Sequence, residues 1–497
     1  MKRYEKFADD IAELIRTGVL AAGQRVPSVR YASQTHGISP STVFQAYYLL
    51  ERRGLIRARP RSGYFVNDSI RLQGLSDNAI EQDARPAPQL SESTEVDVSE
   101  LVFSVLESIK DPNTVPFGSA FPSAALFPLQ RLARSLASAT RDMDPRMVVS
   151  DLSPGNPALR RQIALRYMVA GQMLPMDELL ITNGALEALN LCLQAVTEPG
   201  DLVAIEAPAF YACLQVLERL KLKAVEIPVH PQQGIDLAVL EQALERYPIK
   251  ACWSMTSFQN PTGATVPEAR KRELVQLLRK HEVPLIEDDV YAELYYGQHA
   301  PKPAKAFDTE GLVLHCGSFA KSLAPGYRVG WVAAGRYAQK VERLKIMTSL
   351  CASMPAQAAI ADYLQHGGYD RHLRKLRHSL EDQQRAMLGA IARYFPAQTR
   401  VSQPTGGYFL WVELPEQIDS LKVFQAALAQ GISIAPGPMF SPTRRFQPFI
   451  RLNYGSPWGE APEQAMETLG KIIRSMQWSN FPGHLDKWKI HLSRSST

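Results

Sequence analysis

Residues 317–328 read GSFAKSLAPGYR and place Lys321 shortly after a run of apolar residues at 312–316. In open α/β sheets, ligands bind at the carboxyl ends of the strands, so a lysine at this position stands where a site is expected. Apolar neighbours can lower the pKa of such a lysine enough for it to form an imine with an aldehyde. Ser318 and Arg328 add a hydroxyl and a guanidinium, which are groups that hold a phosphate. The stretch therefore predicts a strand and a loop that bind a phosphorylated aldehyde.

The sequence around this stretch predicts a parallel sheet covered by helices, because short apolar runs alternate with amphipathic helical stretches. The predicted strands are five runs at 202–205, 251–255, 284–286, 312–316 and 329–333. Polar or glycine-containing segments follow most of these runs. Those trailing segments are where the ligand groups of such a sheet gather.

Four further segments carry groups that could complete a site with Lys321. EDDVY at 287–291 offers a carboxylate to a cationic ring nitrogen, and NPTG at 260–263 follows another strand. TNGA at 182–185 opens a helix whose first N–H groups can bind a phosphate. Arg451, inside the apolar FIRL segment, needs an anion, either a ligand carboxylate or a core carboxylate. An aldehyde, a pyridinium nitrogen and a phosphate are the three groups of pyridoxal 5′-phosphate (PLP).

Over residues 100–478 these segments resemble the class I and II aminotransferases of PLP fold type I. The resemblance rests on Ser-x-x-Lys at 318–321 with an arginine seven residues beyond the lysine, on Asn-Pro-Thr-Gly at 260–263 and on Asp-x-x-Tyr at 288–291. It implies an α/β module with a large and a small subdomain, PLP as cofactor, and a homodimer.

The same resemblance implies roles for individual residues, with Lys321, Asp288 and Tyr291 as the catalytic ones. Lys321 would form the imine with the cofactor and shuttle the α-proton, and Asp288 would keep the ring nitrogen protonated. Asn260 and Tyr291 would hydrogen-bond the phenolic oxygen of the ring. The remaining implied contacts are Phe210 stacked on the ring, Asn183, Gly184, Ala185, Ser318 and Arg328 on the phosphate, and Arg451 on the α-carboxylate of an amino acid.

Two of these assignments have rivals in the sequence. Asp289 competes with Asp288, although the spacing to Tyr291 favours Asp288. Phe210 could belong to the core, with Tyr211 stacking in its place. His281, His315 and His372 lack the spacing of metal ligands and are expected on the surface or in the core, so no metal site is predicted.

The chain also departs from the aminotransferase pattern at two places. Relatives often carry a tyrosine just before the segment GNPALR at 155–160, where it reaches the phosphate of the partner subunit. Here the preceding residues, 149–154, read VSDLSP and contain no tyrosine. Ala320 replaces a hydroxyl that often stands beside the lysine. We therefore expect one phosphate contact to be missing or to be supplied differently.

Composition and charge point to a soluble cytoplasmic protein with a basic N-terminal part. No apolar run approaches the roughly 18 residues of a membrane helix, and no secretory signal opens the chain. Five cysteines without CxxC spacing argue against a disulfide framework or a zinc cluster. Residues 1–68 carry 11 Lys and Arg against 6 Asp and Glu, whereas the other 429 residues carry 44 of each sign. This surplus of positive charge suggests that the N-terminal part alone binds a polyanion.

The N-terminal residues predict three helices and a hairpin. Apolar residues from Tyr4 to Ile15 have helical spacing, Ser28 and Gly37 can begin and end a second helix, and Ser39 or Ser41 can cap a third. Two strand-like pieces, 55–58 and 64–66, follow around a basic turn. This order is typical of a winged helix-turn-helix, which lays its third helix in the major groove of DNA.

Over residues 3–66 the chain resembles the GntR-type winged helix-turn-helix, through VPSVR at 26–30, GIS at 37–39, STV at 41–43, GLI at 54–56 and SGYFV at 62–66. The resemblance implies that Arg30 contacts DNA, that Ser41, Thr42 and Gln45 face the groove, and that Arg59, Arg61 and Gly63 form the wing. Many relatives carry arginine where this chain has Pro40, and some carry it at Phe44. Base readout is therefore expected to rest more on Ser, Thr and Gln.

The composition between the two modules predicts a flexible linker, because residues 77–98 are rich in Asp, Glu, Ser, Gln and Pro. The expected organisation is a DNA-binding domain at 1–68, a linker at 69–98, an aminotransferase-like domain at 99–478 and a tail at 479–497.

A winged helix-turn-helix fused to a fold type I module resembles the MocR-type regulators of the GntR superfamily. The resemblance implies a PLP-dependent transcriptional regulator that binds double-stranded DNA and senses PLP or its adduct with an amino compound. The alternative is an active aminotransferase that acts on an amino acid and whose DNA-binding head is incidental or only localises it. Every residue that transamination minimally needs is present, so the sequence leaves both open.

Overall fold

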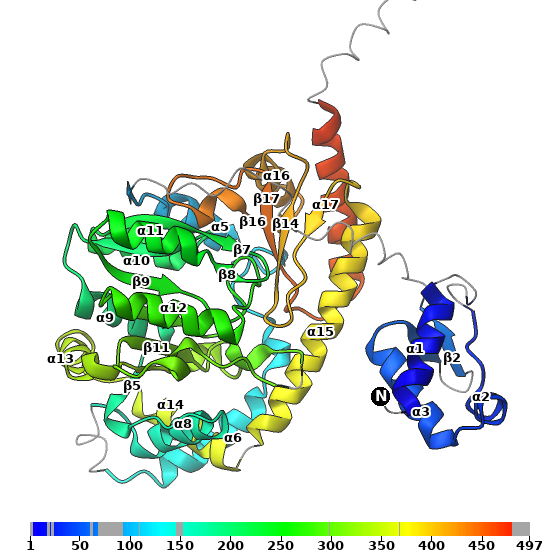
Figure 1. Ribbon diagram of the computed structural model, residues 1–497, viewed down its shortest axis with the longest axis horizontal. Helices are drawn as coiled ribbons and strands as arrows, with labels where there is room; N and C mark the ends of the chain where they lie inside the picture. The colour runs from blue at the N-terminus through cyan, green and yellow to red at the C-terminus, as the bar shows by residue number, and fades with distance from the viewer. Residues whose placement is uncertain are drawn as a thin grey trace, which may run out of the picture. The chain divides into compact units, whose positions relative to one another are not determined.

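The computed structural model describes residues 3–16, 20, 24–59, 63–67, 93–108, 110–145, 153–297, 299–366 and 368–479. The chain divides into two compact units, the first of which is built around residues 1–78 (Figure 1). We call this first unit the head and the second the body. None of the helices in the described residues is both long and apolar enough to cross a membrane.

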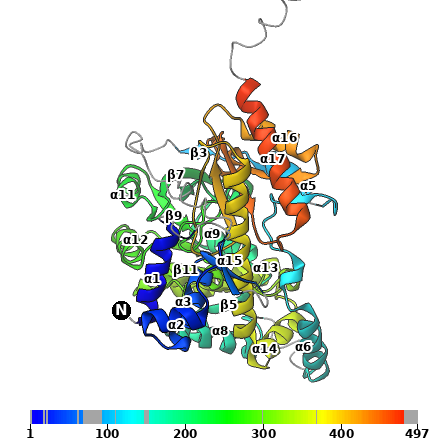
Figure 2. The same cartoon turned by 90° about the vertical axis from the view of Figure 1, so that its right-hand side faces the viewer.

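The head contains three helices (Figure 2) and a two-stranded antiparallel hairpin, which confirms the winged helix-turn-helix prediction. Its elements are α1 (Arg3–Arg16), α2 (Val29–His36), α3 (Pro40–Arg52), β1 (Ile56–Arg59) and β2 (Gly63–Val66). Ser28 caps α2, and Gly37 ends it in the left-handed conformation, as predicted. Of the two serines predicted to cap α3, Ser39 does so, because its side chain accepts a hydrogen bond from the Thr42 N–H.

The core of the head joins all of these elements. Helix α3 buries Val43, Ala46, Tyr47 and Leu50 against Phe7 and other residues of the head core. Spacings of three and four residues place these side chains on one face of the helix, and the opposite face is left to solvent.

The large sheet of the body has the strand order β3-β7-β6-β9-β10-β11-β12-β5, with β8 beside β7. Its strands are β3 (Thr94–Glu95), β5 (Leu179–Thr182), β6 (Leu202–Ala207), β7 (Lys223–His230), β8 (Gly234–Ile235), β9 (Ile249–Ser254), β10 (Leu285–Asp288), β11 (Val313–Ser318) and β12 (Gly330–Ala333). All five predicted strands exist, but the predicted parallel sheet is mixed. Strand β12 is antiparallel to β11 and β5. The loop after β11 is too short for the crossover that a parallel neighbour needs.

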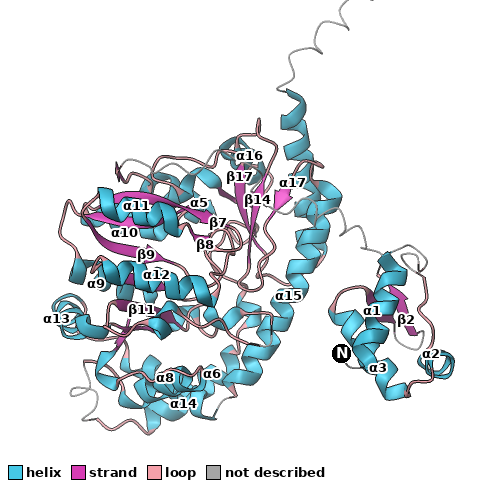
Figure 3. Cartoon of the chain, viewed as in Figure 1, coloured by secondary structure: helices cyan, strands magenta, loops and turns pink. Residues whose placement is uncertain are grey.

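Helices cover both faces of this sheet (Figure 3). Val313 packs with α11 (Leu237–Arg246) and α12 (Glu268–Lys280). Cys316 Sγ lies 3.7 Å from Cys192 Sγ of α9 (Ala185–Val196), on the other face, because side chains alternate along a strand. Asp288 pairs in register with Cys316 and so faces the α9 side. The other described α-helices of the body that precede residue 369 are α5 (Ser99–Ser108), α6 (Leu129–Arg141), α8 (Pro157–Val169), α10 (Tyr211–Leu220), α13 (Ala338–Thr348) and α14 (Met354–His366).

A smaller antiparallel sheet has the order β13-β14-β17-β16. Its strands are β13 (Arg400–Val401), β14 (Phe409–Glu413), β16 (Ala435–Pro436) and β17 (Phe449–Asn453), and its helices are α15 (Tyr369–Tyr394), α16 (Ser420–Leu428) and α17 (Glu460–Ser479). A short parallel pair, β4 (Val115–Pro116) and β15 (Ile432–Ser433), lies apart from both sheets. The large and small sheets correspond to the two predicted subdomains.

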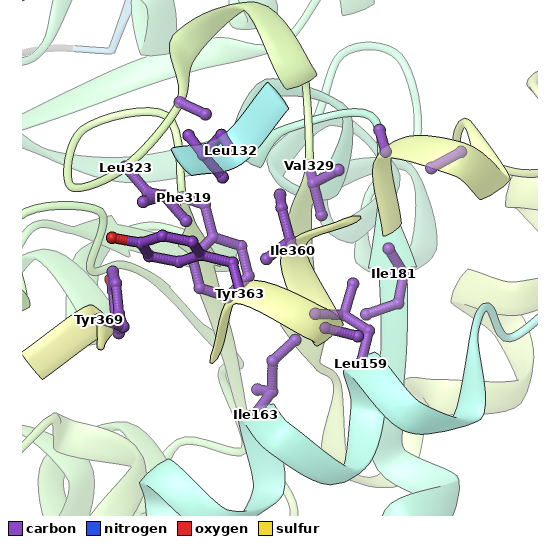
Figure 4. Close-up of a cluster of buried hydrophobic side chains, with 14 of the residues drawn as sticks. Leu132, Leu159, Ile163, Ile181, Phe319, Leu323, Val329, Ile360, Tyr363 and Tyr369 are labelled. Atoms are coloured by element: carbon purple, nitrogen blue, oxygen red, sulfur yellow. The ribbon is translucent and has the colours of Figure 1, made fainter. Parts of the chain in front are cut away.

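A buried cluster fixes the loop between β11 and β12 (Figure 4). Phe319, Leu323 and Val329 come from this loop and its ends, and they pack with residues of α8, α14 and β5. The Ser322 hydroxyl lies 2.8 Å from the Tyr369 hydroxyl, and the Ser322 carbonyl lies 2.7 Å from His372 Nε2. Because the loop is held on both sides of position 321, the lysine stands on a rigid base.

The body begins earlier than expected, because Thr94 and Glu95, inside the predicted linker, form β3 at the edge of the large sheet. Just after β3, the Val98 N–H and the Ser99 hydroxyl both bond to the Glu218 carboxylate, at 3.2 and 2.9 Å. Backbone pairing to an open edge strand needs no apolar sequence pattern, so composition could not show it. Residues 68–92 of the linker and the tail from 480 on lie outside the described residues.

Candidate functional site

Lys321 is a half-buried residue in the loop after β11. Its Nζ donates to the Ala120 carbonyl at 2.7 Å and lies 3.8 Å from the centre of the Phe121 ring. Burial lowers the pKa of Lys321 to about 7, and the nearby positive charge of Arg451 acts in the same direction. A large share of the amine is therefore neutral, and nucleophilic, near neutral pH.

The structure distinguishes Asp288 from its rival Asp289. Asp289 Oδ2 lies 3.0 Å from His315 Nε2, whereas the carboxylate of Asp288 accepts no side-chain hydrogen bond in the described part of the chain. Burial raises the pKa of Asp288 to about 7, and the charge of Asp289 adds to the effect. Asp289 thus already has a hydrogen-bonded partner in His315, and Asp288 is the carboxyl group that can take a cationic partner.

Behind the two aspartates runs a buried chain of hydrogen bonds that the sequence did not reveal. His315 Nδ1 bonds to the Tyr167 hydroxyl, which also accepts from Trp331 Nε1 at 3.1 Å. Burial opposes protonation of His315, but the hydrogen bond to Asp289 raises its pKa above the ordinary value. The sequence left the surface and the core open for His315, and the structure places it in the core, in β11 beside β10.

At the N-terminus of α9, the Arg328 guanidinium packs so closely on Gly184 that a Cβ there would overlap it. The positive charge of the guanidinium and the positive end of the helix dipole thus lie together at Gly184, and this combination favours the binding of an anion. Gly184 has a φ of 80°, and Ala185 follows it as the first helical residue. Ser318 Oγ accepts from the Ala320 N–H at 3.0 Å. Asn183 differs, because its backbone N–H and side-chain amide both bond to the Glu187 carboxylate.

Arg451 is fully buried in β17 and belongs to no ion pair of the described residues. Its Nη1 donates to Asn260 Oδ1 at 3.0 Å, and its Cζ lies 4.3 Å from the centre of the Phe409 ring. Asn260 Nδ2 and Arg451 Nε have no hydrogen-bond partner in the described residues. No carboxylate of the described residues pairs with Arg451, so the guanidinium retains donors for an anion.

The predicted aromatic residues differ in how near they lie to Lys321 and Arg451. Tyr291 is buried, with its ring centre 5.9 Å from Lys321 Nζ, and burial raises its pKa. Phe210 is half-buried at the start of α10, where its ring centre lies 4.9 Å from that of buried Tyr211. The Tyr211 ring centre is 6.0 Å from the Arg451 guanidinium. The geometry therefore leaves both aromatic residues beside the predicted site.

Residues 118–121, which we call the strap, connect Lys321 with Arg451. The carbonyls of Gly118 and Ser119 accept from Arg451 Nη2 at 2.6 and 3.1 Å. The Ala120 carbonyl accepts a hydrogen bond from the Lys321 amine, and the Phe121 carbonyl accepts one from Asn453 Nδ2 at 2.8 Å. Backbone oxygens of the strap thus bond to the groups predicted to bind a carboxylate and an aldehyde. Carbonyls have no sequence signature, so the strap could not have been found from the sequence.

The head presents most of its predicted DNA contacts on the surface. Arg30, Ser41, Gln45 and Gly63 are exposed, and Thr42 is half-buried. Gly63 has a φ of 96°, and a Cβ there would lie 3.4 Å from the Arg25 guanidinium. Arg59 ends β1, but its side chain and all of Arg61 lie outside the described residues. Among the described residues no cluster of side chains could hold a metal ion.

Two family models match the chain, one for each unit. Residues 3–66 match the model of bacterial regulatory proteins of the gntR family, and residues 124–463 match that of aminotransferase class I and II. The chain belongs to the MocR-type regulators of these two families. MocR-type proteins join a GntR-type DNA-binding domain to an aminotransferase-like domain, which is the architecture observed here.

Similar proteins support this assignment over the full length. The chain is 48% identical to the HTH-type transcriptional regulator YdcR of Escherichia coli K12, over 95% of this chain and 99% of that one. It is 36% identical to YjiR of the same organism, over 96% and 100%. The body resembles the crystal structure of LysN, an α-aminoadipate aminotransferase of Thermus thermophilus in complex with N-(5′-phosphopyridoxyl)-L-leucine. That match has a TM-score of 0.69 and 27% identity, and covers 77% of this chain and all of the other.

Proposed function

We propose that this MocR-type protein binds PLP through Lys321 and regulates transcription in response to PLP or to its adduct with an amino compound. The observation that carries the proposal is the set of unsatisfied groups around the amine. Neither carboxylate oxygen of Asp288 has a side-chain partner among the described residues, and Asn260 Nδ2 has no hydrogen-bond partner there. The Arg328 guanidinium lies against Gly184 at the N-terminus of α9. These groups match the ring nitrogen, the phenolic oxygen and the phosphate of PLP, so the residues fit the cofactor.

Each residue has a distinct task in this proposal. When bound, PLP supplies an aldehyde for the lysine and an electron-accepting ring. Lys321 provides the neutral amine, and Asp288 holds a proton on the ring nitrogen. Gly184, Ala185, Ser318 and Arg328 bind the phosphate, with Asn183 contributing its position rather than its amide donors. Tyr291 and Asn260 hydrogen-bond the phenolic oxygen, and Phe210 covers the ring.

The effector that fits this site is an amine with a carboxylate, such as an amino acid. A buried guanidinium without an ionic partner favours a carboxylate over the neutral carbonyls of the strap, because a charged acceptor makes the stronger hydrogen bond. Binding would therefore release the Gly118 and Ser119 carbonyls. We propose that this change acts in a cytoplasmic homodimer whose two heads occupy paired DNA half-sites. Linker length would set the spacing that they can reach.

The absorption spectrum tests cofactor binding. Purified wild-type protein incubated with PLP should show a visible band that persists after gel filtration, and Lys321→Ala should lack it. Lys340→Ala, which removes an exposed lysine of α13, serves as the matched control and should retain the band. A wild-type protein that stays colourless, or a band that survives in Lys321→Ala, would overturn the proposal.

A second candidate function is transamination, because Lys321, Asp288, Tyr291 and Arg451 lie at one site and the body resembles LysN at 27% identity. Sustained formation of keto acid from an amino acid and a second keto acid, over many turnovers per protein, would favour the enzyme. At most a single turnover, together with DNA binding that depends on the amino acid, would favour the regulator.

A further inference from the structure

Helix α3 of the head exposes a stripe of uncharged side chains, two of which are aromatic. Phe44 and Gln45 lie three and four residues after Ser41, and Tyr48 lies four and three residues after them, so the four share one face. That face lies opposite the buried residues of α3 and is accessible to solvent. Phe44 is 52% exposed and Tyr48 is 65% exposed, although both side chains are largely apolar.

This face contains no cation. From Pro40 to Glu51 the sequence has no Arg or Lys, and Arg52 is the last residue of the helix. Guanine is recognised in the major groove mainly by an Arg or Lys that bonds to its O6 and N7 atoms. A helix without these residues lacks the side chains that best identify a G·C pair.

The hydroxyls at the start of the helix are occupied by its cap. Ser39 Oγ lies 2.8 Å from both Ser41 Oγ and Thr42 Oγ1. By contrast, the Gln45 amide makes no hydrogen bond within the described part of the chain, and the Phe44 ring stacks on no other ring there. The side chains of this face that remain free to contact bases are therefore the rings of Phe44 and Tyr48 and the primary amide of Gln45, and Phe44 and Gln45 lie nearer the start of the helix.

We infer that α3 reads A·T pairs, with Phe44 on the 5-methyl group of thymine and Gln45 on the N6 and N7 atoms of adenine. The inference rests on the proposed DNA-binding function and adds its base specificity. The thymine methyl is the one apolar group that base pairs present in the major groove, and a glutamine amide matches adenine with two hydrogen bonds. Phe44 and Gln45 are consecutive on the exposed face, so both can reach the same or neighbouring pairs.

The cations of the head have a different place and task. Arg30 is exposed on α2, and the Arg25 guanidinium packs on Gly63 at the hairpin. Cations that flank the recognition helix bind phosphates, which gives affinity and position but no base preference. The charge surplus of the head thus supplies binding strength, and the uncharged face of α3 supplies the sequence preference.

The experiment uses the full-length protein with PLP and a library of random 30-base-pair duplexes. Bound duplexes are selected and sequenced, and affinities are then measured by fluorescence anisotropy at fixed salt. In the selected site each thymine is replaced in turn by uracil, which lacks the methyl group, and each adenine by 7-deazaadenine, which lacks the N7 acceptor. The proteins are wild type, Phe44→Ala, Gln45→Ala and, as matched control, Phe103→Ala, which removes an exposed ring from the body.

The selected half-sites should share at least one A·T pair. Uracil at that pair should weaken wild-type binding about fourfold, the change that corresponds to ~0.8 kcal/mol for one buried methylene group. Phe44→Ala should bind thymine and uracil duplexes equally, Gln45→Ala should lose sensitivity to 7-deazaadenine alone, and Phe103→Ala should match wild type. Selection of half-sites whose shared pairs are all G·C, or no effect of uracil in wild type, would overturn the inference and leave DNA binding intact. Failure to select any duplex would overturn both, and would assign the aromatic stripe to a protein partner.

Discussion

Lys321, Asp288 and Arg451 are buried or half-buried ionisable groups that belong to no ion pair of the described residues. A buried charge without a partner costs free energy, so a fold that needed only stability would not retain three of them together. Burial lowers the pKa of Lys321 and raises that of Asp288, each to about 7. Perturbed pKa values of this kind cluster at functional sites.

The lowered pKa of Lys321 sets the pH dependence of PLP capture. A lysine with a pKa of about 7 loses its proton as the pH rises through that value, and only the neutral amine attacks an aldehyde. The rate of PLP binding should therefore rise between about pH 6 and pH 8 and then level off. Stopped-flow absorption at a series of pH values measures this rate. A rate that keeps rising above about pH 9, as for an ordinary lysine, would contradict the assignment.

Arg451 should select ligands by their carboxylate. Truncation of one partner in a buried, hydrogen-bonded charge pair commonly costs about 2–5 kcal/mol. Arg451→Gln should therefore weaken the response of the PLP band to amino acids by roughly 30-fold or more. An amine of similar size without a carboxylate is the matched ligand, and its response should not change. Equal weakening for both ligands would indicate a damaged site rather than lost selection.

Two structural elements position the site, namely the loop after β11 and the first turn of α9. Phe319, Leu323 and Val329 fix the loop in a buried cluster. At α9, Gly184 combines a left-handed φ of 80° with the close approach of Arg328. Glycine is required there twice, because other residues rarely adopt this φ and a Cβ would displace the guanidinium.

Gly184→Ala should therefore weaken PLP binding by tenfold or more, because it displaces Arg328 from the place where the helix N-terminus favours an anion. Gly200→Ala is the matched control: its φ is 97°, but a Cβ there meets nothing within 4 Å. Both variants carry the strain of a positive φ, and only one disturbs the site. Titration of the visible band with PLP gives the affinities, and equal losses in the two variants would contradict the role of Gly184.

The sequence predicted the elements whose signals are local. The caps Ser28 and Ser39 and the strands that precede the site motifs follow from residue type and spacing. It missed β7, where Pro228 and the charged Lys223 and Glu226 interrupt the apolar residues, and β3, which joins the sheet by backbone pairing. The direction of β12 depends on the length of a loop rather than on any motif.

The site shows the same division. Lys321, Asp288 and Arg451 were predictable because their residue types and positions after or within strands are informative. The bond between His315 and Asp289 depends on the pairing of β10 with β11, and the strap acts through carbonyl oxygens. Neither leaves a pattern in one sequence. The hydrogen bond from the Asn183 amide to the Glu187 carboxylate likewise could be found only in the structure.

For the whole molecule, charge separates the two tasks. The surplus of basic residues lies within residues 1–68, and the other 429 residues carry equal numbers of each sign. In the proposed function, salt-dependent contact with DNA phosphates would therefore belong to the head, and ligand recognition to the body. Regulation requires a coupling free energy between the two sites, which is typically about 1–3 kcal/mol.

The affinity of the full-length protein for a duplex from its own upstream region tests this coupling most directly. It should be measured for wild type and Lys321→Ala, without ligand, with PLP, and with PLP plus each common amino acid. The account predicts that at least one condition changes the wild-type dissociation constant by about 5- to 150-fold and leaves that of Lys321→Ala unchanged. Affinities that never change in wild type, or that change equally in both proteins, would contradict it.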